Sequence, residues 1–519
     1  MTTLFNDIKY SIRQFIRSPG FALVAVLTLA LGIGANTAVF GLLNAVMFRS
    51  LPVRNAHELR GIHWVGGITP NVWGRVVGAP NGEQTSNTFT YPAYCALRDG
   101  HTGMAEIFGF FEMGPTAVIR GQASRVNALL VSGNFFQGLG VEPKQGRLMM
   151  PEHDRPDAAP VTVISHRAWQ QHFASDPHVI GQEIVLDQVS ATVIGVLPQG
   201  FLGIEKGRRS DFYLPLSLQP QIKGACALES TDLWWVQVMG RLQPSVDELE
   251  VGRSLGTLLT RTMGESGAPD LRILLADGSA GLSGALAPRL GVMAKPLYLL
   301  FGLVGIVLLV TCINLAGLLL ARGARRHHEF AVRVALGAQR GRLICQLLTE
   351  SAVLAVFGGG GGFLLAAWIK PALSRILWAS DTSLGLQSDI QVYGFMLAIV
   401  VVTTILFGLL PALRMARIDP ASNLKQRTLL GGSRLGLNKM LISLQVGLSL
   451  FLLVGAGLFT RTLINIRRIE AGFDTENLLV FHAEAGERKA DFCQSVSALP
   501  AVQAVTHYSH PLLTGARGN

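Results

Sequence analysis

Charged residues are scarce in this chain, which argues against an ordinary soluble protein. Asp, Glu, Lys and Arg make up only 15% of its 519 residues, whereas an ordinary soluble domain contains roughly 25%. Hydrophobic residues make up 49%, and the mean hydropathy is +0.38. This balance predicts that much of the chain lies in lipid rather than in water.

The motifs of several enzyme classes are also absent. No Walker A sequence occurs, and the run Gly358–Gly362 lacks the Gly-Lys-Ser/Thr that a phosphate-binding loop requires. His328-Glu329 lacks the second histidine of zinc proteases, and there is no Gly-x-Ser-x-Gly elbow. His327 and His328 are expected in a solvated loop. We therefore expect a protein that is not an enzyme and holds no cofactor or metal.

Long apolar runs, by contrast, are abundant. A bilayer span needs about 20 mostly apolar residues, and core helices of soluble proteins, the alternative, rarely run this long without a polar face. The sequence therefore predicts an α-helical membrane protein with five transmembrane helices. These lie near Phe21–Phe48, Leu297–Leu320, Leu343–Ile369, Val392–Leu413 and Met440–Thr460.

The distribution of charge predicts the orientation. Residues 1–20, 321–342 and 412–439 carry net charges of +2, +5 and +5, whereas residues 49–292 hold 20 basic and 22 acidic residues. Short loops rich in Lys and Arg stay on the cytoplasmic side. We therefore expect a multi-pass protein of the bacterial inner membrane with a cytoplasmic amino terminus. Contact with anionic membrane lipids then accounts for the pI of about 9.6 without nucleic acid.

Residues 1–20 are predicted to form a cytoplasmic amphipathic helix in the membrane interface. The apolar stretch that follows, residues 21–48, is longer than the 7–15 residues typical of a cleavable signal peptide. It therefore favours a retained first span. The apolar face of the amphipathic helix comprises Leu4, Phe5, Ile8, Ile12 and Phe15, and its basic residues are Lys9, Arg13 and Arg17.

Residues 49–292 are long enough for a domain with its own core. The runs APVTVISHRAW, GQEIVLDQVSATVIGVLPQGF and SDFYLPLSL read as short strands between turns, and HRAWQQHF and DELEVGRSLGTLLTRTM read as helices. This pattern predicts a large α+β extracytoplasmic domain of one or two subdomains. The compartment permits a Cys95–Cys226 disulfide, but the spacing does not require one.

Several motifs carry a resemblance to a known family. The run EFAVRVALGAQRGRLICQLLTESAVLAVFGGGGGFLLA resembles the core of the FtsX-like permeases, which include MacB-type transporters. The outer runs VSGNFFQGLGVEPKQGRLMMPEHD, ISHRAWQQHF and ATVIGVLPQGF resemble the MacB-like periplasmic core domain, especially that of the duplicated orphan permeases of Acidobacteria. Positions matching the permease motif are Glu329, Arg333, Gly337, Ala338, Gln346, Glu350, Ser351 and Gly358–Gly362.

The resemblance implies a domain order. Residues 293–425 would form the FtsX-like permease domain with spans two to four, and residues 426–463 a cytoplasmic linker with span five. The resembled subgroup repeats its unit of one span, outer domain and three spans. Residues 464–519 would therefore be the start of a second periplasmic domain that is truncated, the alternative being a genuine five-span protein.

The resemblance also implies a function. The chain would be a permease-like subunit of an ABC-type export or mechanotransmission system, coupling a separate ATPase to its periplasmic domain. The alternative is a non-transporting scaffold or signal transducer that regulates an envelope partner. The candidate partners are a separate ABC ATPase subunit, a homodimer or second permease copy, and a periplasmic adaptor.

The six arginines of residues 321–342 suggest a coupling element. Topology alone explains their cytoplasmic place, but several charged residues recur at steps of three and four and so share one helical face. The Gly337-Ala338 pair is expected to break that helix, and a soluble partner can push a short polar helix held at the membrane surface. The candidate coupling residues are Arg322, Arg326, Glu329, Arg333, Gly337, Ala338 and Glu350.

Small residues within the spans predict close helix packing. Asn36 is expected to hydrogen-bond across helices, and the middle of each span lacks ionisable residues, which argues against a proton relay. The candidate packing residues are Gly32, Gly34, Asn36, Gly358 and Gly362.

Overall fold

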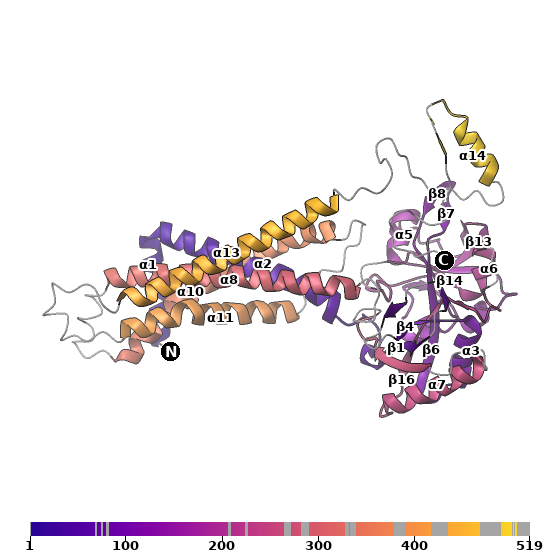
Figure 1. Ribbon diagram of the computed structural model, residues 1–519, viewed down its shortest axis with the longest axis horizontal. Coiled ribbons are helices and arrows are strands. Elements are labelled where there is room, and N and C mark those ends of the chain that lie inside the picture. Colours follow the sequence, from indigo (N-terminus) through magenta and orange to yellow (C-terminus); the bar gives the residue numbers. More distant parts are fainter. Residues whose placement is uncertain are drawn as a thin grey trace. The chain divides into compact units, whose positions relative to one another are not determined.

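The computed structural model divides the chain into two units, residues 1–452 and 453–519 (Figure 1). The residues that it describes are 2–67, 70–73, 76–78, 83–205, 209–223, 227–263, 271–281, 290–326, 332, 339–377, 390–416, 434–467, 489–500, 502 and 504–505.

The first unit contains a group of long helices. The amphipathic helix α1 (Thr2–Arg17) leads into α2 (Pro19–Leu43), and a single π-helical turn, Asn44–Phe48, continues α2. Three further long helices in this unit are α8 (Leu290–Arg325), α10 (Arg340–Leu377) and α11 (Ile390–Ala416). Helix α13 (Arg434–Arg467) crosses the boundary between the units, and α14 (Lys489–Ser497) lies in the second.

Five of these helices are long and apolar enough to span a bilayer, which confirms the predicted number. The spans observed agree with those predicted to within a few residues at each end. They are Pro19–Leu43, Leu297–Gly323, Gly341–Ile369, Ile390–Leu413 and Lys439–Thr462.

Helices α2, α8, α10 and α11 pack around a common apolar core. Helix α2 packs against both α8 and α10, and α11 packs against α8 and α10. Leu29 and Ile33 of α2 and Ala355 of α10 are fully buried in this core. The side of α2 away from its neighbours exposes large apolar side chains such as Leu27, which is 57% exposed, as expected for a helix face that lipid covers.

The residues between α2 and α8 form an α+β domain, as predicted. Its helices are α3 (Tyr91–Gly100), α4 (Phe135–Leu139), α5 (His166–Phe173), α6 (Gln219–Lys223) and α7 (Glu248–Met263), with 3₁₀ turns at Ala56–Glu58, Pro151–His153 and Leu216–Leu218. Its strands are β1 (Leu59–Gly66), β2 (Asn71–Val72), β3 (Val77–Gly78), β4 (Gln84–Ser86), β5 (Thr88–Phe89), β6 (Met104–Met113), β7 (Thr116–Ile119), β8 (Gln122–Arg125), β9 (Ala128–Val131), β10 (Gln145–Gly146), β11 (Val161–Ile164), β12 (Glu183–Leu186), β13 (Val189–Val196), β14 (Phe212–Pro215), β15 (Leu233–Trp234), β16 (Val236–Leu242) and β17 (Arg272–Asp277).

Fifteen of the strands form one mixed sheet. Its main path runs β3-β4-β1-β16-β6-β9-β14-β11-β13-β12-β7-β8, while β17 pairs with β1 off that path. Strands β9 and β14 are parallel, as are β11 and β13, and the other pairs in this sheet are antiparallel. The two faces carry separate apolar clusters, one around Trp64 and Trp235 and one around Phe135, Phe136 and Tyr213.

Local signals explain where these elements begin and end. Within the β-rich run APVTVISHRAW, strand β11 extends only from Val161 to Ile164. The Ser165 hydroxyl then accepts a hydrogen bond from Ala168 N at 3.0 Å and begins α5. The predicted helices HRAWQQHF and DELEVGRSLGTLLTRTM are confirmed as α5 and α7. Cys95 carries a free thiol, so it forms no disulfide in this structure, and Cys226 lies outside the described residues.

Candidate functional site

Three arginines meet α1 and the start of α2: Arg322 of α8, Arg326 directly after α8, and Arg342 of α10. We call them, with Asp7, Tyr10, Ser18 and Glu350, the arginine cluster. Arg322, near the end of α8, donates a hydrogen bond from Nη2 to Ser18 Oγ at 2.7 Å. Its guanidinium also lies 4.5 Å from the centre of the Phe21 ring, a cation–π contact. Arg322 therefore ties the end of α8 to the junction between α1 and α2.

Arg326 makes the second connection, between α8, α10 and α1. Its Nη1 lies 3.3 Å from both carboxylate oxygens of Glu350, and its Nη2 donates to Tyr10 Oη at 3.0 Å. The Glu350 side chain is only 6% exposed and that of Arg326 only 14%. Removal of either partner would leave the other charge buried, which is strongly destabilising.

Arg342, at the start of α10, makes the third connection. Its two terminal nitrogens donate to the two carboxylate oxygens of Asp7, with Nη2 to Oδ1 at 2.6 Å. Such paired contacts between guanidinium and carboxylate fix orientation as well as distance. Asp7 is 7% exposed. The cluster thus attaches α1 to α8 and α10 at several points.

The structure brings together only part of the predicted coupling element. Arg322 lies in the last turn of α8 and Arg326 directly follows it, and Glu350 meets Arg326 across 24 residues of chain. The other predicted coupling residues, Glu329, Arg333, Gly337 and Ala338, lie outside the described residues, as do His327 and His328. The partners of these arginines on α1 were not predicted from the sequence. The one feature that pointed to them is that Asp7 is the single acidic residue of the basic segment 1–20.

Glycines allow α2 to approach α10 closely. A Cβ atom built on Gly34 would lie 2.8 Å from Gly362 O, and one built on Gly362 would lie 2.9 Å from Gly34 N. Further along the same interface, a Cβ on Gly358 would lie 2.5 Å from Leu29 Cβ. Side chains at these positions would separate the two backbones.

The contact between α2 and α8 combines a small residue with a buried amide. A Cβ on Gly32 would lie 3.0 Å from Leu308 Cδ1. Asn36, which is 2% exposed, donates to Val304 O of α8 at 3.0 Å and to Gly32 O at 2.9 Å. An amide whose hydrogen bonds are satisfied in this way can be buried among apolar helices.

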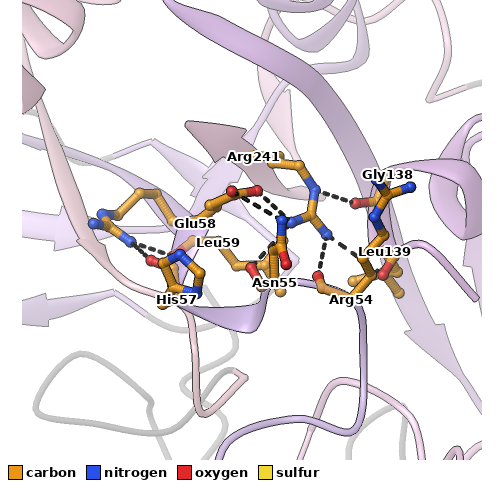
Figure 2. Close-up of polar contacts among 9 residues, drawn as sticks. Arg54, Asn55, His57, Glu58, Leu59, Gly138, Leu139 and Arg241 are labelled. Carbon is orange, nitrogen blue, oxygen red and sulfur yellow. Dashed lines mark hydrogen bonds and ion pairs between the residues drawn. The ribbon is translucent and has the colours of Figure 1, made fainter. Parts of the chain in front are cut away.

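A second polar site lies where the chain from α2 joins the sheet. Figure 2 shows Arg241 of β16 at the centre of this site, which we call the Arg241 clamp. Its guanidinium donates to main-chain oxygens of Arg54 (2.8 Å), Asn55 (3.0 Å), Gly138 (3.1 Å) and Leu139 (3.4 Å), and to the Glu58 carboxylate at 2.9 Å. The clamp therefore binds residues 54–58 to the end of α4.

Electrostatics reinforce the clamp. The Arg241 side chain is 13% exposed and that of Glu58 is 19% exposed, and the hydrogen bond from Arg241 lowers the pKa of the Glu58 carboxyl below its usual value. Beside it, Arg60 donates to His57 O at 2.7 Å and pairs with Glu248 at the start of α7. This site could not be predicted from the sequence, because four of its five acceptors are main-chain carbonyls.

The chain leaving α2 and the chain returning toward α8 meet at the same place. Strand β1 pairs antiparallel with β17 from Arg60 opposite Asp277 to Val65 opposite Arg272. The pairing continues toward the helices, because Gly278 N donates to Leu59 O at 2.9 Å and Leu51 N to Ser279 O at 2.8 Å. The two connections of the domain are thus neighbouring strands, and the Arg241 clamp lies at their helix-proximal end.

The two parts of the chain match two protein families. Residues 22–258 match the MacB-like periplasmic core domain, and residues 301–420 match the FtsX-like permease C-terminal domain. The first match covers the α+β domain as far as α7, with most of α2, and the second covers most of α8, α10 and α11.

Named relatives are export proteins. The pyoverdine export ATP-binding/permease protein PvdT of Pseudomonas syringae pv. tomato is 28% identical over 280 residues, which are 53% of this chain and 39% of PvdT. The macrolide export ATP-binding/permease protein MacB of Escherichia coli K12 is 27% identical over 297 residues, 57% of this chain and 42% of MacB. The chain thus spans about two fifths of the length of these relatives.

Among solved structures, the periplasmic region of MacB from Actinobacillus actinomycetemcomitans is 17% identical and covers 41% of this chain and 88% of its own, with a TM-score of 0.31. The two family matches follow one another along the chain in the order of one apolar helix, an α+β domain and three apolar helices. This chain belongs to the FtsX/MacB-like ABC transporter permeases, multi-pass proteins of the inner membrane.

Proposed function

We propose that this permease converts the work of a separate ATPase into movement of its α+β domain. The α1 end of the helices would face the cytoplasm, residues 49–292 would lie in the periplasm, and residues 293–425 would form the permease domain. The positive-inside bias of residues 1–20, 321–342 and 412–439 supports this orientation.

One observation carries the proposal: a chain of close contacts runs from the arginine cluster to the sheet. The cluster joins α1, α8 and α10 at one end. Helix α2 packs against α8 and α10, and the chain runs from the end of α2 through residues 49–58 into β1, which pairs with β17. Because close-packed elements transmit strain, a push on the end of α8 would reach β1 through α2, and β17 through its pairing with β1.

The Arg241 clamp has a defined part in this path. Residues 49–58 connect α2 to β1, and a connection without support would bend instead of transmitting force. Hydrogen bonds from Arg241 hold residues 54–58 against α4 and β16. The clamp would therefore convert a shift of α2 into a shift of the sheet.

Movement of the domain would serve to expel an amphiphile, peptide or lipoprotein, with a periplasmic adaptor as a further partner. The named relatives are pyoverdine and macrolide export proteins. The second candidate is a non-transporting scaffold or signal transducer whose α+β domain regulates an envelope partner. Residues 1–519 contain no Walker A motif, so export would require an ATPase outside these residues, whereas the scaffold would not.

Affinity purification from native membranes tests the proposal. We expect an ABC ATPase subunit to copurify with the natural chain and to be lost with Arg326→Glu, which places a carboxylate beside Glu350. Arg272→Glu, an exposed change in β17, is the matched control and should retain the ATPase. Recovery of an envelope enzyme without an ATPase would support the scaffold instead, and equal ATPase recovery with both variants would remove the arginine cluster from the coupling path.

Cysteine labelling tests the orientation separately. In a background without natural cysteines, Asp157→Cys should react with a membrane-impermeant maleimide in intact spheroplasts. Gln339→Cys should react only after lysis. Both natural side chains are exposed, so a reversed pattern would refute the proposed orientation rather than reflect poor access.

A further inference from the structure

Helix α1 has two faces with different chemistry. Its buried face comprises Asp7, Ser11 and Phe15, spaced four residues apart and 7%, 0% and 8% exposed. This is the face that the arginine cluster holds, through Asp7 and Arg342. The side chains of the outer face do not belong to the arginine cluster.

Large apolar side chains project from the outer face. Phe5 is 69% exposed, Ile12 38% and Ile16 72%. Their spacing of seven and four residues places them on one stripe of the helix. In water such a stripe is unfavourable, so something apolar is expected to cover it.

A row of cations borders the stripe. Lys9, Arg13 and Arg17 are spaced four residues apart, and all three are exposed. Within the part of the chain that the structure describes, none of them takes part in an ion pair. An apolar stripe beside a cationic row matches a surface whose apolar interior lies under negative headgroups.

The position of α1 limits what can cover this face. Ser18 is the only residue between α1 and α2, and α2 begins a membrane span at Pro19. Ser18 N donates to Phe15 O at 3.1 Å and Ala22 N to Ser18 O at 3.2 Å, so the junction is itself hydrogen-bonded. Helix α1 is therefore held at the depth where a span meets the bilayer surface.

We propose that the outer face of α1 is a binding surface for anionic phospholipids. Phe5, Ile12 and Ile16 enter the boundary between headgroups and acyl chains, and Lys9, Arg13 and Arg17 contact the negative headgroups. Because the buried face contacts Arg342 through Asp7, bound lipid holds α1 in the position from which it supports the arginine cluster. The inference stands whether or not the permease works with an ATPase.

Spin labels on the full chain test this surface. In a background whose five natural cysteines are replaced by serine, the label is placed at Ile16→Cys, with Asp157→Cys as control because Asp157 is an exposed residue of the α+β domain, outside the membrane helices. The protein is placed in nanodiscs of phosphatidylcholine alone or mixed with phosphatidylglycerol. Collision rates with oxygen, which enriches in lipid, and with a water-soluble nickel chelate then report where each label lies.

We expect phosphatidylglycerol to increase the ratio of oxygen to nickel collisions at residue 16 and to leave the ratio at residue 157 unchanged. Each cation near an anionic surface contributes roughly fivefold to binding, so the ratio should at least roughly double. Lys9→Gln/Arg13→Gln/Arg17→Gln should abolish the increase, whereas Lys9→Arg/Arg13→Lys/Arg17→Lys, which keeps the charge, should retain it.

Two results would overturn the proposal. A label at residue 16 that collides mainly with the nickel chelate in both lipids would place this face in water, open to a protein partner. A label immersed equally in both lipids, or unaffected by the triple glutamine variant, would show apolar contact without preference for anionic headgroups. The charge-preserving variant separates these results from a failure of α1 to fold.

Discussion

Replacing Arg241 by methionine should destabilise the α+β domain. The substitution keeps an unbranched apolar side chain in β16 but removes five hydrogen bonds, four to main-chain oxygens and one to Glu58. At about 0.5–1.5 kcal/mol for each bond, a simple sum spans about 2.5–7.5 kcal/mol. The 3.4 Å bond to Leu139 is weak, and freed carbonyls will regain some water. We therefore expect a loss of about 3–5 kcal/mol in the free energy of unfolding.

Tryptophan fluorescence of the full chain during urea unfolding measures this loss. Five of the seven tryptophans, at 64, 73, 169, 234 and 235, lie in the α+β domain, so the signal reports mainly on that domain. The matched control is Arg272→Met, because the Arg272 side chain is 68% exposed and pairs with Glu83. That surface pair is expected to contribute at most about 1 kcal/mol.

Equal midpoints for Arg241→Met and Arg272→Met, with equal dependence on urea, would refute the reasoning. This result would mean that residues 54–58 keep their position without Arg241. The clamp would then have no part in transmitting movement from α2. A large loss that also lowers the urea dependence would instead show that part of the domain is already unfolded before the transition.

Three further predictions concern pH, packing and charge. Burial lowers the pKa of His63 to about 4, so the unfolded chain binds the proton more readily than the folded chain. The free energy of unfolding should therefore fall by about 3 kcal/mol as the pH falls from about 6.5 toward 4. His63→Gln should flatten this dependence in urea unfolding followed across pH, and an unchanged slope would contradict it. Gly34→Ala should force α2 from α10 and cost about 1–3 kcal/mol, whereas Gly302→Ala, where a Cβ meets nothing within 4 Å, should be near neutral; both are measured by thermal unfolding in detergent, and equal shifts would contradict the close approach. Glu350→Leu should leave Arg326 without its buried partner and cost about 3–5 kcal/mol, while Arg326→Met/Glu350→Leu should recover most of the loss in the same assay; a double variant as unstable as the single one would show that the pair is not coupled.

Periodicity and composition were sufficient for the parts of the fold that depend on local sequence. The five spans follow from uninterrupted apolar length, and α5 follows from its Ser165 cap and its helical spacing. Short strands could not be found in this way. Strand β8, Gln122–Arg125, is exposed at every residue and lacks apolar alternation, so only its pairing with β7 defines it.

The side-chain contacts of the candidate sites were even less predictable from the sequence than the short strands. The family motif drew attention to Glu350 and the charge pattern to Arg326, but neither indicated that the two residues pair. Asp7 and Arg342 are 335 residues apart in the chain, and a single sequence contains no signal that would bring them together. The Arg241 clamp could not be predicted for a different reason. Main-chain carbonyls are present at every residue, so the sequence does not show which of them accept hydrogen bonds from Arg241.

The pairing of β1 with β17 has a consequence for how such proteins diversify. Because the first and last strands of the α+β domain are neighbours, its two ends emerge at one point, with Leu51 N bonded to Ser279 O at 2.8 Å. A domain whose ends are adjacent can be inserted into, or removed from, a host chain without altering the distance between the flanking helices. The same membrane helices are therefore suited to carry different extracytoplasmic modules, exchanged as single cassettes between residues 49 and 290.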